Sequence, residues 1–201
     1  MLRLFLLAIG AVILSGCAAS RPDAAPAPEM RPASETRPVT QWDFRPEAAI
    51  WTRAAMEMLE TDAAILTQVV PEDAEYWCPG YSQADEARRA AFWTGFMSAL
   101  ARYESTWNAD AVGGGGRYYG LLQIYPPTAR YRDCEADTGT ALRDGAANLR
   151  CALRIMAITV PRDGVVSQGR RGVAADWGPM RDAEKVAEMR AWLRQQSYCR
   201  A

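Results

Sequence analysis

The 201-residue sequence predicts a mainly α-helical domain in which loops between the helices build a cleft. Three observations favour this fold class. Apolar residues recur at helical spacing in four segments, glycine-rich stretches fall between those segments, and no long stretch alternates apolar and polar residues as a half-buried strand would. With 49% hydrophobic residues and no internal repeat, the chain has the material for one domain with a buried core.

The N-terminus has the pattern of a secretion signal. Arg3 precedes an apolar run, residues 4–14, that is too short to span a membrane. The sequence LSGC that ends at Cys17 resembles a bacterial lipobox, so residues 1–16 are expected to be a lipoprotein signal peptide and Cys17 to carry lipid. An ordinary signal peptide with an incidental Cys17 is the alternative. Ala18 stands where aspartate is associated with retention in the inner membrane, which favours an outer-membrane anchor facing the periplasm.

Residues 17–46 are expected to be a tether between the lipid and the domain. Residues 18–46 hold six of the twelve prolines and few large apolar residues, so they bury too little surface to fold. At roughly 3.1 Å per residue, such a segment reaches on the order of 90 Å. The folded domain is therefore expected to cover residues 47–201.

The first two helices of the domain are predicted from apolar spacing and end signals. The first covers about residues 47–68 and is stopped by Pro71. Ser82 is a good N-cap for the second helix, with Asp85 three residues later. This second helix is expected to continue to about Ser105.

The third and fourth helices complete the predicted domain. The third begins near Asp144 and ends at about Thr159, where Pro161 follows. The fourth covers about residues 182–196. Three stretches between the helices are expected to be loops: VGGGG (112–116), RDGVVSQGRRG (162–172) and DWGPM (176–180).

Four cysteines remain besides Cys17, an even number in a chain that is expected to reach an oxidising compartment. Two disulfides are therefore expected. Of the three possible pairings we favour Cys134 with Cys151, which joins the start of a loop to the next helix, and Cys78 with Cys199, which ties the C-terminus to the core. A zinc site built from all four cysteines is the alternative, but the chain has no C-x-x-C spacing.

The composition excludes several kinds of chemistry. The chain has no histidine, so Ser-His-Asp and Cys-His nucleophilic systems and imidazole metal sites are ruled out. Its net charge of −1 gives no bias toward nucleic acid. No metal or cofactor is expected. Catalysis would have to rest on carboxylates, hydroxyls, amides or the single lysine, Lys185.

Glu104 is the carboxylate whose position is most informative. It shares one stripe of the second helix with Trp93, Met97 and Leu100, at spacings i, i+4, i+7 and i+11. Apolar surroundings and the negative end of the helix dipole both disfavour the ionised form, so the pKa of Glu104 should be raised. A carboxylic acid of this kind can protonate a glycosidic oxygen. A solvated glutamate at the end of a helix is the alternative.

The stretches ESTWNADAV (104–112), GLLQI (120–124) and Asn148-Leu149 together resemble the signature of the lysozyme-like lytic transglycosylases. These are the soluble-lytic-transglycosylase type, which is related to goose-type lysozyme. The stretches match in order the family patterns ES-x-[FW]-N-P-x-A-V, G-L-[ML]-Q-[IL] and N-[IL], over roughly residues 90 to 180. The resemblance implies a lysozyme-like helical fold.

The resemblance also implies a reaction on peptidoglycan glycan strands. The β-1,4 bond between N-acetylmuramic acid and N-acetylglucosamine would be cleaved without added water. Glu104 would first protonate the glycosidic oxygen and then, as carboxylate, accept the proton of the muramoyl 6-hydroxyl, which closes a 1,6-anhydro ring. The 2-acetamido group would assist, so one carboxyl suffices. The alternatives are a lysozyme-type hydrolase, a non-catalytic peptidoglycan-binding lipoprotein, and a structural lipoprotein with a chance match.

The same resemblance assigns substrate-binding roles to residues that follow Glu104. Ser105 would orient Glu104 or the acetamido group, and Gln123 would hydrogen-bond a sugar. Other residues expected to line the substrate site are Tyr118 and Tyr119, which would stack on sugar rings, Gly120, Leu121, Leu122 and Asn148. Leu149 and Met156 are expected in the core, and Gly113 to Gly116 are expected to form a tight turn.

Two further roles concern the partner of Glu104 and a second carboxylate. The family commonly has a tyrosine late in the domain whose hydroxyl contacts the catalytic glutamate, and this chain has AADWGPM there, so Trp177 is expected to take that place. Tyr103, Tyr118 and Tyr119 are alternatives. Asp110 and Asp133 are the candidates for a second carboxylate, and Asp110 is expected to be a solvent-facing loop residue.

Overall fold

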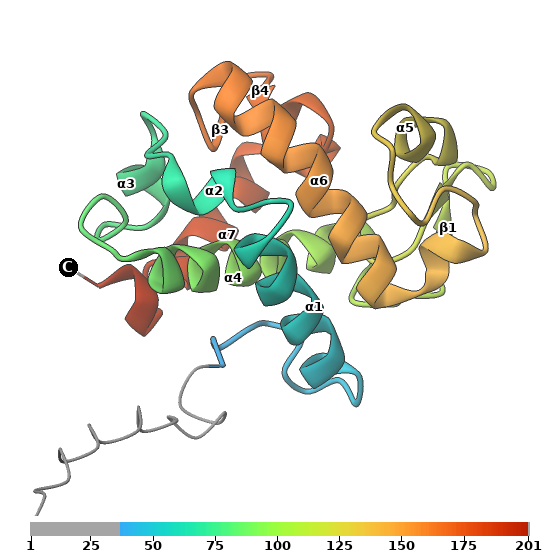
Figure 1. The fold of residues 1–201 in the computed structure, drawn as a ribbon, viewed down its shortest axis with the longest axis horizontal. Coiled ribbons are helices and arrows are strands. Elements are labelled where there is room, and N and C mark those ends of the chain that lie inside the picture. Colours follow the sequence, from blue (N-terminus) through green and yellow to red (C-terminus); the bar gives the residue numbers. More distant parts are fainter. Residues whose placement is uncertain (1–36, 201) are drawn as a thin grey trace, which may run out of the picture. The chain divides into compact units, whose positions relative to one another are not determined.

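The fold is organised around one long helix, α4 (Glu86–Ser105), and the other helices lie around it (Figure 1). The computed structural model describes residues 37–200, so the predicted signal peptide, Cys17 and most of the predicted tether lie outside the described residues. Within residues 37–200, no helix combines the length and the apolar character of a membrane span. The remaining α-helices are α1 (Ala48–Glu60), α2 (Ile65–Gln68), α3 (Ala74–Trp77), α5 (Pro126–Tyr131), α6 (Gly145–Asp163) and α7 (Ala183–Leu193). The short 3-10 helices are η1 (Ala141–Arg143), η2 (Val173–Ala175), η3 (Gly178–Arg181) and η4 (Ser197–Cys199).

Helix α4 carries the centre of the hydrophobic core. Phe92, Trp93 and Phe96 are fully buried, and the Trp93 ring packs edge to face against both phenylalanines. The predicted N-cap of this helix was wrong: Asp85 caps it by accepting the backbone N–H of Arg88 at 2.8 Å, whereas the Ser82 hydroxyl donates to Glu75. The aspartate lies directly before the first helical turn, where an acceptor can reach the free N–H groups.

The first predicted helix is two helices in the structure. Helix α1 ends at Glu60 because Thr61 leaves helical geometry and donates its hydroxyl to the carbonyl of Glu57 at 2.8 Å. A turn follows before α2 begins at Ile65. The prediction of one helix over residues 47–68 was therefore wrong. The apolar residues on both sides of the short polar turn keep helical spacing, so the spacing does not reveal the turn.

Helix α6 begins as predicted and ends later than predicted. Asp144 caps it by accepting the N–H of Ala147 at 2.8 Å. The helix continues past Thr159 and contains Pro161 in its last turn, before Gly164 ends it in a left-handed conformation with φ of 70°. Proline removes one hydrogen bond near the end of a helix, and the capping glycine completes the turn that follows.

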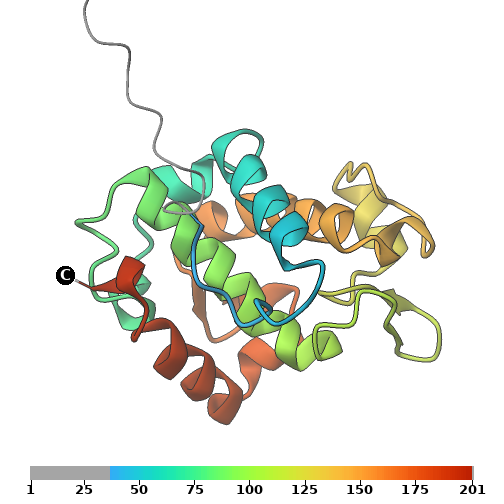
Figure 2. The ribbon, with the colours of Figure 1, turned by 90° about the horizontal axis from the view of Figure 1, so that it is seen from below.

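Helix α7 runs alongside α4 (Figure 2). Asp182 is its N-cap and accepts from the N–H of Glu184 at 3.1 Å. The helix ends at Leu193, earlier than the predicted residue 196, and η4 follows. Tyr198 of η4 and Leu193 both pack against Gly95 of α4, a close approach that a side chain at that position would block.

Two short antiparallel hairpins form at the predicted loops: the first extends beyond residues 112–116, and the second lies within residues 162–172. Strands β1 (Val112–Gly113) and β2 (Tyr118–Tyr119) pair with Val112 opposite Tyr119. Strands β3 (Ser167–Gln168) and β4 (Arg171–Gly172) pair with Ser167 opposite Gly172. The turn of the first hairpin uses Gly114, Gly115 and Gly116, all with positive φ, so three of the four predicted turn glycines have the conformation that glycine favours.

Both predicted disulfides are confirmed. Cys78 bonds to Cys199, and Cys134 bonds to Cys151. The first joins the residue that follows α3 to η4, and the second fastens the segment after α5 to α6. All four cysteines of the alternative zinc site are therefore used in disulfides.

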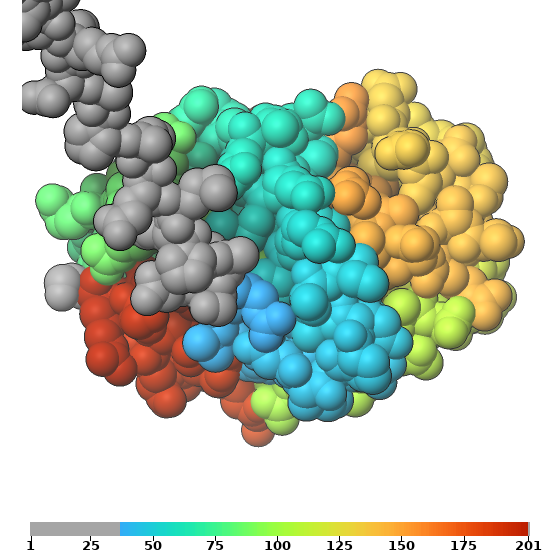
Figure 3. Space-filling view, turned by 60° about the horizontal axis from the view of Figure 1, so that its bottom comes forward, coloured from blue at the N-terminus to red at the C-terminus, as the bar shows by residue number. Residues whose placement is uncertain are grey.

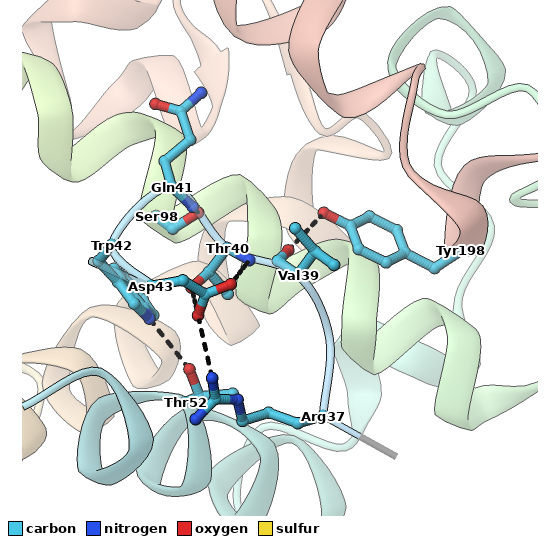
Figure 4. A network of polar contacts seen from close by, with 9 residues as sticks. All are labelled: Arg37, Val39, Thr40, Gln41, Trp42, Asp43, Thr52, Ser98 and Tyr198. Atoms are coloured by element: carbon cyan, nitrogen blue, oxygen red, sulfur yellow. Dashed lines mark hydrogen bonds and ion pairs between the residues drawn. The ribbon is translucent and has the colours of Figure 1, made fainter. Parts of the chain in front are cut away.

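The folded unit begins before the predicted boundary at residue 47. Residues 37–46, here called the strap, lie against α4, α1 and η4, and Trp42 is fully buried (Figure 4). The Trp42 indole donates to Thr52 Oγ1 at 3.0 Å, and the backbone N–H of Gln41 donates to Ser98 Oγ at 3.0 Å. Figure 3 shows the strap in the surface between α1 and the C-terminal residues. Proline-rich composition therefore misled the prediction of a tether to residue 46.

Candidate functional site

Glu104 lies in the last turn of α4, at the end of a fully buried stripe. Trp93, Met97 and Leu100 have no exposed surface, whereas Glu104 itself is only partly buried. Burial raises the pKa of Glu104 from its ordinary 4.5 to about 7, and the nearby charge of Lys185 opposes this shift. The raised pKa predicted from the stripe is thus confirmed, with burial as its main cause.

The chain turns sharply after Glu104 in a conformation that is unusual for its residues. Thr106 and Trp107 both have left-handed backbone angles, with φ of 53° and 56°. The Trp107 indole donates to the carbonyl of Ser98 at 2.8 Å, and Phe44 of the strap packs edge-on against its ring at 5.2 Å. These contacts fix where the helix ends and hold Glu104 at the start of the turn.

The GLLQI segment forms the second part of the site. Gly120 has φ of 81° and lies against the Leu142 carbonyl and the Asn148 amide, so any side chain there would collide with both. Gln123 also has positive φ, 45°, and its amide donates to the carbonyls of Ala111 and Gly120 at 3.2 and 2.9 Å. Its side chain therefore fastens the segment to the β1–β2 hairpin.

Asn148 and Trp177 hold this segment from behind. The buried Asn148 amide donates to the carbonyls of Tyr119 and Leu142 at 2.9 Å and accepts from the N–H of Leu122 at 2.9 Å. Trp177 donates its indole N–H to the Leu122 carbonyl at 2.9 Å. Both residues thus position the segment. The expectation that Trp177 contacts Glu104 is wrong, because its only donor is used on Leu122.

The other predicted site residues have distinct positions. Leu121 and Leu122 are fully buried, so they pack beneath the segment. The Ser105 hydroxyl donates to its own helix, at the Ala101 carbonyl, 3.3 Å away. Leu149 and Met156 lie in the core as predicted.

No tyrosine among residues 37–200 donates a hydrogen bond to Glu104. Tyr103 donates to Glu188 Oε2 at 2.6 Å, and burial together with this carboxylate raises the pKa of Tyr103 to about 12. Tyr119 donates to the Gly116 carbonyl at 2.6 Å. Tyr118 remains 39% exposed and packs against Tyr125 at 5.7 Å.

A pocket adjoins the GLLQI segment. Its walls combine aromatic rings, one amide and one carboxylate, and they are formed by Tyr118, Gln123, Ile124, Tyr125, Thr128, Ile155, Asp176 and Trp177. Sugars are bound by surfaces of this kind, because C–H faces pack on aromatic rings while hydroxyls bond to amides and carboxylates.

Asp176 is a site residue that the sequence analysis missed. Desolvation raises its pKa, although Arg132, Arg162 and Arg181 oppose the shift. Its position in the chain, directly before Trp177 in the AADWGPM stretch, was the available signal.

The two carboxylates considered earlier lie elsewhere. Asp110 is exposed and pairs with Arg143 at 3.0 Å, which confirms it as a solvent-facing loop residue. Asp133 lies beside the Cys134–Cys151 disulfide, in a different pocket from the one next to Gln123.

Comparisons with known proteins agree with this geometry. Residues 81–165 match the family model of the transglycosylase SLT domain, which confirms the resemblance inferred from the sequence. Solved structures of Bd0314 DslA are similar: two mutants match with a TM-score of 0.73 and one wild-type form with 0.72, each at 25% identity over 82% of this chain and 99% of theirs. The sequence has no significant match among curated proteins.

Proposed function

We propose, from the match of residues 81–165 to the transglycosylase SLT domain, that the protein is a peptidoglycan lytic transglycosylase with Glu104 as its acid–base group. It cleaves the β-1,4 bond between N-acetylmuramic acid and N-acetylglucosamine and leaves 1,6-anhydro ends. The observation that carries the proposal is the position of Glu104 at the end of the buried stripe of α4, where burial raises its pKa to about 7. A group with this pKa is present in both protonation states near neutral pH, as a two-step reaction requires.

The mechanism uses the same carboxyl twice. Protonated Glu104 gives its proton to the glycosidic oxygen as the bond to C1 breaks. The resulting carboxylate then takes the proton of the muramoyl 6-hydroxyl, whose oxygen bonds to C1. Among residues 37–200, Lys185 is the only charged group that shifts the pKa of Glu104, so no second carboxylate is coupled to it. This supports a reaction that needs one carboxyl.

The pocket beside Gln123 is the proposed sugar-binding surface. Tyr118 and Tyr125 offer aromatic faces, and the Gln123 and Asp176 side chains offer polar atoms. Since Asn148 and Trp177 bond to the backbone of the GLLQI segment, we assign them to the support of this surface and not to direct sugar contact.

A hydrolase of the lysozyme type is the second candidate, and Asp176 favours it. This carboxylate lines the pocket next to Gln123, where it could activate a water for attack at C1. The Asp176→Asn variant separates the two mechanisms. A transglycosylase keeps its 1,6-anhydro products in this variant, whereas a hydrolase that relies on Asp176 as base loses most of its activity.

The decisive experiment is digestion of purified sacculi followed by mass spectrometry of the fragments. We expect 1,6-anhydro ends from the wild type and a loss of at least about 100-fold in rate for Glu104→Gln. Glu60→Gln is the matched control, because Glu60 also lies in the last turn of a helix, α1, but is exposed. Reducing ends as the main product would establish hydrolysis in place of transglycosylation.

A non-catalytic wall-binding protein is separated by the same variants. A pure binder retains sacculi equally well in the wild-type and Glu104→Gln forms and releases no fragments in either. An enzyme releases fragments only with Glu104 intact, while sedimentation with sacculi persists in the variant.

The anchor and the location are proposals from the sequence. Lipid attached to Cys17 would hold the domain at the outer membrane, facing the periplasm and the peptidoglycan layer. Labelling cells with radioactive palmitate tests this: the wild type should incorporate label and Cys17→Ala should not. Fractionation of the membranes then identifies which one retains the protein.

A further inference from the structure

Helices α4 and α7 pack side by side in opposite directions, with a register that three contacts define. Near the start of α4, Arg88 donates to the carbonyl of Arg200. In the middle, a Cβ placed on Gly95 would lie 3.4 Å from Leu193 Cδ2. Residue numbers therefore rise along α4 as they fall along the C-terminal segment.

The third contact lies in the last turn of α4, directly before Glu104. Tyr103 donates to Glu188 Oε2 at 2.6 Å, and Arg102 Nη1 lies 3.4 Å from the same oxygen. Lys185 is three residues before Glu188 on α7 and so shares its face of the helix. Continuing the antiparallel register by this distance brings Lys185 to the C-terminal end of α4, the end that carries Glu104.

Lys185 is held there by its own helix end. Its Nζ lies 3.2 Å from Asp182 Oδ2, and its side chain is 42% exposed. Asp182 also caps α7 through its other oxygen, which receives the N–H groups of Glu184 and Lys185. The ammonium is thus held at the end of α7 that lies toward the C-terminal end of α4.

The other charged or ionisable groups on the elements packed against α4 mostly have partners of their own within residues 37–200. Arg102 and Tyr103 share Glu188, and Arg181 of η3 donates to the carbonyls of Ala174 and Ala175. The remaining groups are Arg37 with Asp43 in the strap, Arg53 with Glu57 and the exposed Glu60 in α1, Glu184 and Arg190 in α7, and Tyr198 in η4, whose hydroxyl donates to Val39. Lys185 is the one charge among them that acts on Glu104.

We propose that Lys185 is a positioning residue that acts through Glu104. The Lys185 ammonium stabilises the Glu104 carboxylate that the first proton transfer produces. The catalytic role of Lys185 rests on the proposed function, whereas the electrostatic coupling between Lys185 and Glu104 does not. Burial disfavours the carboxylate that remains on Glu104 once its proton has passed to the glycosidic oxygen. The ammonium at the adjoining end of α7 lowers the free energy of that carboxylate, so it favours the first proton transfer and the intermediate from which the second step proceeds.

The test measures the titration of Glu104 directly, by carbon NMR of labelled glutamate carboxyls, with Glu104→Gln to assign the signal. Lys185→Met should move the Glu104 midpoint upward by about half a pH unit, because it removes a favourable charge. Lys185→Arg should restore it. Asp182→Asn should move it downward, since it frees the ammonium while asparagine still caps the helix.

Arg190→Met is the matched control. It removes one positive charge from α7 as well, but the Arg190 guanidinium lies over the Tyr76 ring of α3, 4.0 Å from its centroid. The titration midpoint of Glu104 in this variant should equal that of the wild type. Circular dichroism verifies that each variant is folded.

The same variants are then assayed on sacculi across the pH range. The alkaline limb of kcat/KM should move in the order of the NMR midpoints. An unchanged midpoint in Lys185→Met, or an equal shift in Arg190→Met, overturns the role of Lys185. A midpoint that moves without any change in the activity profile upholds the coupling but overturns Glu104 as the acid, and with it the proposed function.

Discussion

The indole N–H of Trp177 donates to the backbone carbonyl of Leu122 at 2.9 Å, across 55 residues of sequence. This bond joins the turn between η2 and η3 to the GLLQI segment. Both groups are buried, so the bond forms without competition from water. The tryptophan is thereby a support for the GLLQI segment, and its indole N–H is not available to Glu104.

Replacing Trp177 by phenylalanine should lower the free energy of unfolding by about 1–3 kcal/mol, because the Leu122 carbonyl would remain buried without a donor. Urea denaturation measures the change. Trp192→Phe is the control: that indole has no hydrogen-bond partner among the residues that the structure describes, so its loss should alter stability by less than about 1 kcal/mol. Equal effects of the two substitutions would contradict the supporting role.

The raised pKa of Glu104 predicts an unusual dependence of stability on pH. Its folded pKa, about 7, exceeds the ordinary 4.5, so the folded protein binds the proton more tightly than the unfolded chain. The contribution of this group to stability therefore falls as pH rises from 4.5 to 7, by about 3 kcal/mol in total.

Glu104→Gln should remove this loss. The variant should have a stability close to that of the wild type at pH 4.5 and exceed it by about 2–3 kcal/mol at pH 8, because a neutral amide stays uncharged. Urea denaturation at the two pH values checks this, with Glu60→Gln as a control that should track the wild type. A variant that is less stable than the wild type at pH 8 would refute the adverse burial of Glu104.

Gly120 should be intolerant of any side chain. Gly120→Ala combines an unfavourable positive φ with a collision against the Leu142 carbonyl and the Asn148 amide, so we expect a loss of about 2–4 kcal/mol in unfolding free energy. Gly115→Ala has a similar φ, 67°, but open space around it, and should lose only about 1 kcal/mol. The difference between the two losses of unfolding free energy measures the cost of the collision at Gly120. Equal losses in the two variants would count against the close packing described for Gly120.

The strap should contribute strongly to stability. Trp42→Ala empties a fully buried site and breaks the bond to Thr52, which should lower the free energy of unfolding by about 3–5 kcal/mol. Val39→Ala, in the same segment but 53% exposed, should change it by less than about 1 kcal/mol. A chain that starts at residue 47 should likewise be much less stable than one that starts at residue 37. If both truncated chains unfold at the same urea concentration, the strap is not part of the folded unit.

Local patterns in the sequence predicted the features that depend on one element. The stripe of Trp93, Met97 and Leu100 is a property of a single helix, so it placed Glu104 correctly. The two disulfides followed from a small set of possible pairings.

Features that depend on packing between distant segments were missed or misassigned. The partner of Trp177 is set by how η2 and η3 meet the GLLQI segment, and no spacing in the sequence encodes that. Trp42 lies among prolines, and only its contacts with α1 show that the segment folds. The place of Lys185 depends on the register between α4 and α7, which the sequence does not specify locally.

The Cys78–Cys199 disulfide gives the molecule a mechanical asymmetry. It closes a covalent ring from residue 78 to residue 199 that contains Glu104, Gln123, Asp176 and Lys185, while the strap and α1 lie outside it. A pulling force applied through the N-terminus therefore loads the strap and α1 first. The ring cannot be drawn out to full length while the bond lasts, so the site would be the last part of the protein to yield under tension.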